Sequence, residues 1–188
     1  MRVVSHTCSN TEIVCALGCA DVLVGVDTDS DFPPAVVAPL SKLGRDLELD
    51  IARTAALKPD LVLTSLTVPG HERIVAELQA AGMNTLVIDP IGLEGVYASI
   101  RQIAEALDVS ERGIQLVDEM RTQMPAVVVC GARPKILVEW WPKPVIGPAR
   151  DSWVNDLIHL AGGENPWSKR VGKSLEISDA DAREASPD

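Results

Sequence analysis

Short apolar runs alternate along the chain with segments in which apolar residues recur at helical spacing. The runs at 2–5, 23–27, 61–65 and 85–89 are rich in Val and Leu, as strands buried on both faces of a parallel sheet should be. Alternation of this kind is typical of βαβ units. The chain is therefore expected to have an α/β fold.

Helix signals lie between these runs. Ser9, followed three residues later by Glu12, has the spacing of a capping box and predicts a helix that stops at Gly18. Further helices are expected over 50–58 and 70–82. Nearly every residue from 93 to 124 favours a helix, and the break at 108–110 predicts two consecutive helices. Ser110 can cap the second of them.

The pattern then begins again after Pro125. Lys135–Trp140 is predicted to be a strand, and Asp151–Ala161 a helix closed by two glycines. This repeats the opening of the chain and predicts two Rossmann-like lobes built on one plan. The second lobe lacks a counterpart to the stretch from 60 to 107, so we expect a shortened form of a longer protein.

The expected organisation has three parts. They are an N-terminal α/β lobe at 1–109, a long helix between the lobes at 110–124, and a partial C-terminal α/β lobe at 125–188.

Composition narrows the range of partners. Hydrophobic residues make up 46 % of the 188 residues and charged residues 23 %, which is typical of folded chains. The 17 Lys and Arg against 27 Asp and Glu give a net charge of −10, which disfavours nucleic acid and anionic membranes as partners. No apolar stretch approaches the roughly 20 residues that span a bilayer, so we expect a chain that is not embedded in a membrane.

The first residues contain no recognisable leader. Met1-Arg2 runs directly into a predicted strand, without an apolar signal region or a cleavage site. The sequence is thus compatible with a cytoplasmic protein, or with a periplasmic or cell-surface protein whose leader has been removed.

Two segments resemble known motifs but lack residues that those motifs require. Asp27–Asp31 has the carboxylate spacing of a calcium loop, but Phe32 and Ala38 stand where Gly and Glu are required. Gly172-Lys173-Ser174 resembles the end of a phosphate-binding loop but lacks the upstream glycine and the preceding strand. The first motif leaves an acidic loop at the carboxyl end of a strand, which is the edge where open α/β sheets bind ligands. A plain solvated loop is an equally good interpretation.

The remaining candidate chemistry is sparse. The four cysteines, Cys8, Cys15, Cys19 and Cys130, contain no C-x-x-C pair and are best interpreted as packing residues. The three histidines, His6, His71 and His159, are scattered. The sequence therefore predicts neither a catalytic centre nor a metal site.

Aromatic residues are few and unevenly placed. All four Trp fall between 140 and 167, and Trp140, Trp141 and Trp167 are expected on or beside ligand-facing loops of the second lobe. Such side chains suit a large flat or apolar ligand. Strand alternation would turn only one of Trp140 and Trp141 toward the ligand, unless the proline after them lets both face outward. Trp153, in the first turn of a helix, is expected to pack in the core.

Two helices are expected to start with exposed acidic residues. Glu72 follows Pro69-Gly70, and Asp179 and Asp181 follow Ser178. The helix dipole favours carboxylates in a first turn whatever their function. One acidic helix start in each lobe is also compatible with a matched pair of docking charges.

Taken in order, these segments resemble the substrate-binding proteins of ABC importers for cobalamin, ferric siderophores and haem. The similar segments are Arg2–Ser5, Ser9–Gly18, Val24–Val26, Asp31–Pro34 and Ala56–Leu63. The second half adds Glu139–Pro142, Ser152-Trp153 and Leu160–Asn165, which are similar to the cobalamin-binding subgroup.

The resemblance implies a specific architecture and set of partners. It implies two lobes bridged by a long helix, a ligand in the cleft between them, and an acidic residue on each lobe that engages arginines of a membrane permease. The first acidic position corresponds to Glu72. The second falls at Ala180, between Asp179 and Asp181, and Trp140 matches an aromatic residue that faces the cleft.

We therefore expect a non-catalytic protein that binds a corrinoid and presents it to the transmembrane subunits of an ABC permease, with no cofactor of its own. The expected ligand contacts are His6, Thr7, Cys8, Asp29, Ser30, Arg45, Ser65, Leu66, Thr67, Trp140 and Trp141.

Three alternatives remain open. In the first alternative, the ligand is a ferric siderophore or haem, and Arg45 pairs with its carboxylates or catecholates. The second is a tetrapyrrole chelatase on a similar scaffold, in which His6 or His71 ligates the metal or removes a proton. The third is a degenerate fragment without independent function.

Overall fold

The computed structural model describes residues 1–187 and divides them into two compact units. Unit 1 comprises residues 1–89 and 99–117, and unit 2 comprises 90–98 and the residues from 118 onward. Helices α5 (Gly92–Ala106) and α6 (Ser110–Gln123) contribute residues to both units. They are the two consecutive helices that the sequence predicts, and the second begins at Ser110 as expected.

Unit 1 is built on a five-stranded sheet in which every pairing is parallel. Four of its strands match the apolar runs predicted from the sequence, and the fifth, of two residues, is too short to carry a pattern. The strands, in the order β3-β2-β1-β4-β5 across the sheet, are β1 (Val3–Ser5), β2 (Leu23–Val26), β3 (Ser41–Lys42), β4 (Leu61–Ser65) and β5 (Thr85–Ile88).

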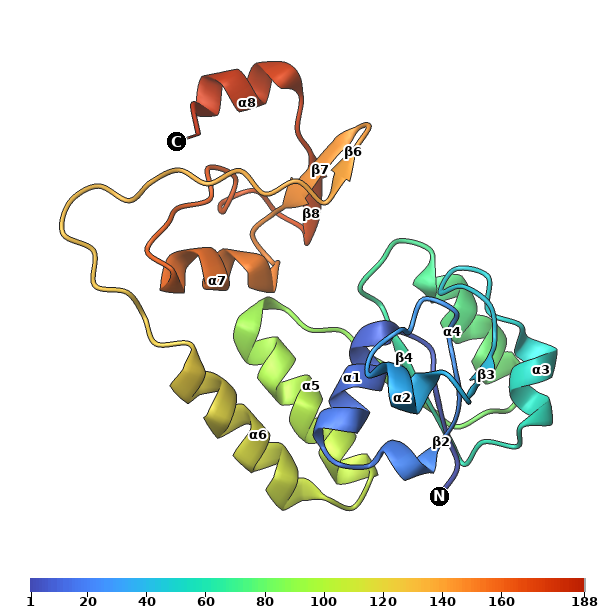
Figure 1. Cartoon of the computed structure of the whole chain (residues 1–188). Coiled ribbons are helices and arrows are strands. Elements are labelled where there is room, and N and C mark those ends of the chain that lie inside the picture. The colour runs from blue at the N-terminus through green and yellow to red at the C-terminus, as the bar shows by residue number, and fades with distance from the viewer. Residues whose placement is uncertain (188) are drawn as a thin grey trace. The chain divides into compact units, whose positions relative to one another are not determined.

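Helices lie on both sides of this sheet (Figure 1). On one side, Ile74 and Leu78 pack against Val4 and Val62, and all four side chains are fully buried. These contacts place the helix after β4 against the centre of the sheet. The helices of unit 1, besides α5 and α6, are α1 (Cys8–Ala16), the 3-10 helix η1 (Ala20–Val22), α2 (Pro34–Val37), α3 (Ile51–Ala56) and α4 (His71–Ala80).

The start of α1 differs from the prediction. Thr7, in an extended conformation, is the N-cap residue, and its carbonyl accepts the first helical hydrogen bond from the Thr11 amide (3.1 Å). Ser9 therefore lies inside the first turn, and the capping box expected from Ser9 and Glu12 is wrong. The helix begins earlier because the chain leaves β1 almost directly into it.

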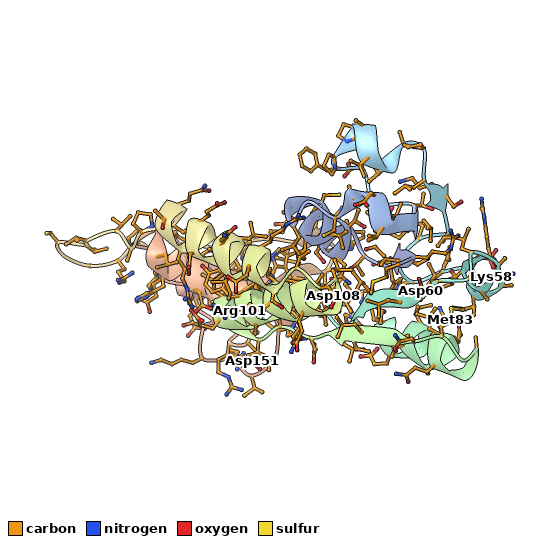
Figure 2. All side chains as sticks on the ribbon, turned by 90° about the horizontal axis from the view of Figure 1, so that it is seen from below. Lys58, Asp60, Met83, Arg101, Asp108 and Asp151 are labelled. Atoms are coloured by element: carbon orange, nitrogen blue, oxygen red, sulfur yellow. The ribbon has the colours of Figure 1, made fainter. Side chains whose placement is uncertain are left out.

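The residues just before β4 and β5 mark the amino end of the sheet. Lys58, Asp60 and Met83 lie at this end of unit 1 (Figure 2). The Asp60 carboxylate accepts a hydrogen bond from the Arg2 amide (2.6 Å), and the Asp60 carbonyl accepts one from Asn84 (3.2 Å). None of the predicted ligand contacts belongs to this end, so the candidate site of unit 1 lies at the opposite, carboxyl edge.

Unit 2 contains a smaller, antiparallel sheet in the order β6-β7-β8. Its helix α7 is capped by the Ser152 hydroxyl, which accepts a hydrogen bond from the Val154 amide (3.2 Å). The elements specific to unit 2 are β6 (Trp141–Pro142), β7 (Val145–Pro148), α7 (Trp153–Leu160), β8 (Ser174–Glu176) and α8 (Asp179–Ala185).

The strand predicted over Lys135–Trp140 is wrong. This segment is irregular, and only an isolated bridge joins Lys135 to Glu164. A regular strand needs a continuous partner on at least one side. Within residues 1–187, the segment instead makes separate backbone hydrogen bonds, such as that from the Ile136 amide to the Glu164 carbonyl (2.8 Å).

None of the helices in residues 1–187 combines the length and the apolar character that crossing a bilayer requires.

Candidate ligand-binding site

The order of the strands creates a switch point between β1 and β4. From β1 the chain winds outward through β2 and β3, and then returns to add β4 and β5 on the other side. In open α/β sheets, ligands bind beside the carboxyl ends of the strands at such a point. The predicted contacts that follow β1 (His6, Thr7, Cys8) and those at the end of β4 (Ser65, Leu66, Thr67) flank it.

A buried network of polar side chains joins the two strands at the switch point. The Thr7 hydroxyl lies 3.2 Å from the Ser65 hydroxyl, and the amide of Asn10 donates to the same Ser65 oxygen (3.2 Å). All three residues are at least 94 % buried. Thr7 and Ser65, both predicted contacts, are thus brought together, and their hydroxyls fix the positions of the two loops.

A second part of this network extends to the end of β2. The Thr11 hydroxyl donates to Ser5 (2.8 Å) and lies 2.9 Å from the Ser30 hydroxyl, which hydrogen bonds to Asp27. Lys42 donates to the Ser30 carbonyl (2.5 Å). Burial raises the pKa of the Asp27 carboxyl, and the hydrogen bond from Ser30 opposes that rise. Ser30 therefore holds the acidic loop in place from the interior.

Other predicted contacts lie at the surface of the same edge. Cys8, Asp29, Arg45 and Thr67 are exposed, and Leu66 is half-buried. The Arg45 guanidinium lies 3.3 Å from the Asp29 carboxylate, which makes an exposed ion pair. Burial and the nearby Asp27 raise the pKa of the Cys8 thiol, so the neutral thiol is favoured. This edge thus offers both charges, hydroxyl groups and apolar surface to a ligand.

His6 is fully buried beneath this edge. Its Nδ1 lies 2.7 Å from the Thr64 hydroxyl and its Nε2 lies 2.5 Å from the Asp46 carbonyl. Burial lowers the pKa of His6, which favours the neutral ring. Since the Asp46 carbonyl can only accept, Nε2 carries the proton in the neutral ring. His6 thus ties the 45–48 loop, defined here as residues 45–48, to the sheet.

The indoles of Trp140 and Trp141 are both exposed in unit 2, by 43 % and 62 % respectively. Trp141 is in β6, and the Trp140 amide donates to the Ile146 carbonyl (2.7 Å) at the adjoining position. Of the two alternatives left open by the sequence, burial of one indole in the core is wrong, and the outward turn of both is the one observed. Strand alternation does not bury either side chain because β6 is two residues long and ends at Pro142.

The other two tryptophans also differ from expectation. Trp153, expected in the core, is 44 % exposed because it occupies the first turn of α7. Trp167, expected on or beside a ligand-facing loop, is 93 % buried and its backbone amide donates to the Asn165 side chain (3.0 Å). The exposed indoles of unit 2 are therefore those of Trp140, Trp141 and Trp153.

The sequence interpretation did not include Phe32 among the candidate contacts. Phe32 lies between β2 and α2, at the carboxyl end of β2, and its ring is 59 % exposed. An exposed aromatic side chain at this edge is informative, because the fold forgoes the free energy that burying its apolar surface would provide. The signal available from the sequence was its position directly after the acidic run, next to two prolines.

The predicted docking residues lie in the first turns of two helices, one in each unit. Glu72 is in the first turn of α4 and its carboxylate accepts a hydrogen bond from the Gly70 amide (2.9 Å). Asp181 forms a capping box with Ser178, whose amide (3.1 Å) and hydroxyl (2.5 Å) donate to its carboxylate. Asp179, in the same turn, is exposed. The capping box lowers the pKa of Asp181.

Clusters of metal-binding side chains and hollows are two further kinds of feature that can carry chemistry. In residues 1–187, no group of three or more His, Cys, Asp or Glu side chains is arranged to hold a metal ion. A hollow of about 510 Å³ in unit 2 is lined by α5, α6 and α7, with Tyr97, Arg121 and His159 among its walls. Its walls include none of the predicted ligand contacts.

Comparison with known proteins assigns the chain a family. Residues 3–188 match the family model described as periplasmic binding protein. An uncharacterised ABC transporter substrate-binding lipoprotein of Bacillus subtilis, YvrC, is 28 % identical over 180 residues, which cover 91 % of this chain and 57 % of that protein. The vitamin B12-binding protein of Salmonella choleraesuis is 25 % identical over 167 residues, covering 87 % and 61 % respectively.

Solved structures agree in fold. The periplasmic haem-binding protein HutB of Vibrio cholerae matches with a TM-score of 0.80 at 22 % identity, over 100 % of this chain and 74 % of that one. The chain spans about three fifths of the length of the curated relatives above. The α/β fold with a parallel central sheet predicted from the sequence is confirmed.

Proposed function

Because the chain belongs to the periplasmic binding protein family, we propose that it is the substrate-binding component of an ABC importer and that its ligand is a corrinoid. The observation that carries the ligand assignment is the pair of exposed indoles, Trp140 and Trp141, in a chain related to vitamin B12-binding proteins. Exposed indoles provide broad apolar surfaces that suit the faces of a large planar ring.

Each unit contributes in a different way. In unit 1, the exposed residues Cys8, Asp29, Arg45 and Thr67 contact the ligand together with Leu66 and Phe32. The buried residues His6, Thr7, Ser30 and Ser65 contribute mainly by holding the loops that carry those contacts. In unit 2, Trp140 and Trp141 cover apolar parts of the ligand. Polar groups in small numbers then set its orientation.

Haem or a ferric siderophore is the alternative ligand. A structural neighbour of this chain is described as a haem-binding protein, and Arg45 is 70 % exposed at its side chain. Its guanidinium is suited to pair with carboxylates or catecholates. The competing pairing with Asp29 is exposed and therefore weak, about 0–1 kcal/mol, so a ligand can displace it.

The enzyme alternative receives less support. A chelatase would need His6 or His71 to reach a substrate, and both rings are at least 99 % buried. The relatives are named as a substrate-binding lipoprotein and a vitamin B12-binding protein. We therefore favour a role in binding and delivery, outside the cytoplasmic membrane, as the name of the lipoprotein relative suggests.

The ligand is tested by titrating the full chain with cyanocobalamin, haemin and a ferric catecholate while following Trp emission. N-Acetyltryptophanamide serves as the control for light absorption by each ligand. Saturable quenching by cyanocobalamin beyond that control is expected. Saturable quenching by haemin or the ferric catecholate alone would replace the corrinoid by the alternative ligand, and quenching by none of them would contradict the proposal.

We further propose that Glu72 and Asp179 dock on basic residues of the permease. Within the first turn of α8, we choose Asp179 over Asp181 because both the amide and the hydroxyl of Ser178 donate to the Asp181 carboxylate. Glu72→Gln and Asp179→Asn should weaken stimulation of the ATPase activity of the reconstituted permease, whereas ligand affinity should not change. Equal activity of both variants and the unmodified chain would contradict this assignment.

A further inference from the structure

The tip of the 45–48 loop is held by three side chains from two other elements. His6, directly after β1, donates from Nε2 to the Asp46 carbonyl (2.5 Å). His71 of α4 places its Nε2 3.3 Å from the Asp46 carboxylate, and Arg73 of α4 donates to the Leu47 carbonyl (2.5 Å). Two of these three attachments are imidazoles, the side chains that change charge between pH 5 and 8.

The two imidazoles are close together and enclosed. Their ring centroids lie 5.1 Å apart, and the exposed fractions are 0 % for His6 and 1 % for His71. His71 Nδ1 is buried and has no hydrogen-bond partner within residues 1–187.

The charges that face this pair come from few elements. The 45–48 loop supplies the Asp46 carboxylate, which contacts His71 and not His6. Each ring faces the other, and β4 supplies only the uncharged Thr64. Arg73 of α4 faces the loop backbone, and Arg45 on the loop pairs with Asp29 of the β2 end. The hydrogen-bond partners of His6 are thus a hydroxyl and a backbone carbonyl, and a positive charge on its ring would have no carboxylate in hydrogen-bond contact within residues 1–187.

We propose that His6, held between Thr64 and the Asp46 carbonyl, forms a pH-sensitive latch, which holds the 45–48 loop against the sheet when its ring is neutral and releases it in acid. Release brings the His6 ring into water, where it can be charged and solvated. The desolvation that lowers the pKa of His6 in the closed form disappears in the open form. Protons therefore bind better to the open form, and acid shifts the population toward it.

The sign and size of the effect follow from this linkage. A ring whose pKa is lowered below the ordinary histidine value of 6.5 in the closed form favours that form fully above pH 6.5. The preference declines as the pH falls below 6.5 toward the lowered pKa. For one ring, the open population rises by at most about tenfold per pH unit in that window.

Release has a consequence for the proposed ligand site, and this step rests on the proposed function. The 45–48 loop carries Arg45, and its Leu47 lies against Gly70, at the start of α4. An open loop removes both from the carboxyl edge of the sheet. Acid is thus expected to weaken ligand binding through the loop, in addition to any direct effect on the ligand.

Amide hydrogen exchange on the ligand-free full chain tests the latch independently of ligand binding. After correction for the intrinsic pH dependence of exchange, protection of a peptide over 43–50 should fall by up to about tenfold per unit between pH 6.5 and 5. A peptide over β4 (61–65) serves as the internal reference and should keep its protection. Unchanged protection at 43–50 across this range would overturn the proposal.

Variants separate the latch from general acid sensitivity. His6→Gln, which keeps a side-chain N–H donor but gains no charge in this pH range, should abolish the pH dependence at 43–50. His159→Gln, at an exposed position of α7, is the control and should behave as the unmodified chain. An undiminished pH dependence in the folded His6→Gln chain would overturn the proposal. If a variant fails to fold, the pH series of the unmodified chain decides.

Discussion

The two units differ in how they present surface to a ligand. Unit 1 places polar side chains at the edge of a parallel sheet and fixes them with a buried network that includes Thr7, Thr11 and Ser65. Unit 2 has a three-stranded antiparallel sheet, and its exposed apolar residues include Trp141 and Val128. Unit 1 thus offers polar side chains that a buried hydrogen-bond network holds in fixed positions, whereas unit 2 offers exposed apolar surface.

The largest expected difference between the units concerns truncation of aliphatic side chains. Ile74→Ala in unit 1 removes a fully buried side chain and should lower the free energy of unfolding by about 2–5 kcal/mol. Val128→Ala in unit 2 removes a side chain that is 88 % exposed and should change it by less than about 0.5 kcal/mol. Urea unfolding followed by circular dichroism measures both. A comparable loss in the two variants would contradict the assignment of Val128 to the surface.

Two glycines with positive φ form a second matched pair. At Gly44 (φ +101°) an added Cβ would collide with the Glu48 carbonyl, whereas at Gly131 (φ +115°) it would meet nothing within 4 Å. Gly44→Ala should cost about 2–4 kcal/mol, from left-handed strain and overpacking together. Gly131→Ala should cost about 1–2 kcal/mol, from strain alone. Equal losses in urea unfolding would show that the turn before Arg45 is not closely packed.

The smallest effect expected is a contrast in the titration of two aspartates. Burial raises the pKa of Asp27 in unit 1, and the capping box lowers that of Asp181 in unit 2. Asp27 therefore makes the unfolding free energy decline as the pH rises above 3.8, the ordinary pKa of an aspartate. The contribution of Asp181 is present above that value and is lost as the pH falls through its lowered pKa.

Carbon-detected NMR of the carboxyl groups measures both titrations directly. The Asp27 signal should move above pH 3.8 and the Asp181 signal below it. Ser178→Ala removes the hydroxyl donor and should return Asp181 toward its ordinary pKa without moving Asp27. A pKa of Asp181 that does not respond to this substitution would exclude the capping box as the cause.

The regular parts of the fold were predictable from the sequence because buried parallel strands are continuous apolar runs. The strand 61–65 was predicted with its observed ends, and the break between α5 and α6 was predicted from residues 108–110. The strand predicted at Lys135–Trp140 was wrong because an apolar run indicates burial but does not specify a partner strand. The start of α1 was misplaced because a Ser and a Glu three residues apart also occur inside a first turn.

The candidate site was only partly predictable. Residues at the ends of β1, β2 and β4 could be located, since the carboxyl ends of parallel strands meet at one edge. The sequence did not reveal which of them are buried, such as His6 and Ser65, or that Phe32 is exposed. Burial at a loop depends on contacts between segments distant in sequence, such as His6 with Asp46, and no local pattern encodes them.

Isothermal titration calorimetry with cyanocobalamin tests the central claim most directly. Relative to the unmodified chain, Trp140→Ala and Trp141→Ala should each weaken binding by about tenfold or more, because each removes an exposed indole from the proposed contact. Trp153→Ala, at a position of nearly equal exposure (44 % against 43 % for Trp140), is the matched control and should bind almost as tightly as the unmodified chain. Undiminished affinity in both Trp140→Ala and Trp141→Ala, or a loss confined to Trp153→Ala, would contradict the claim.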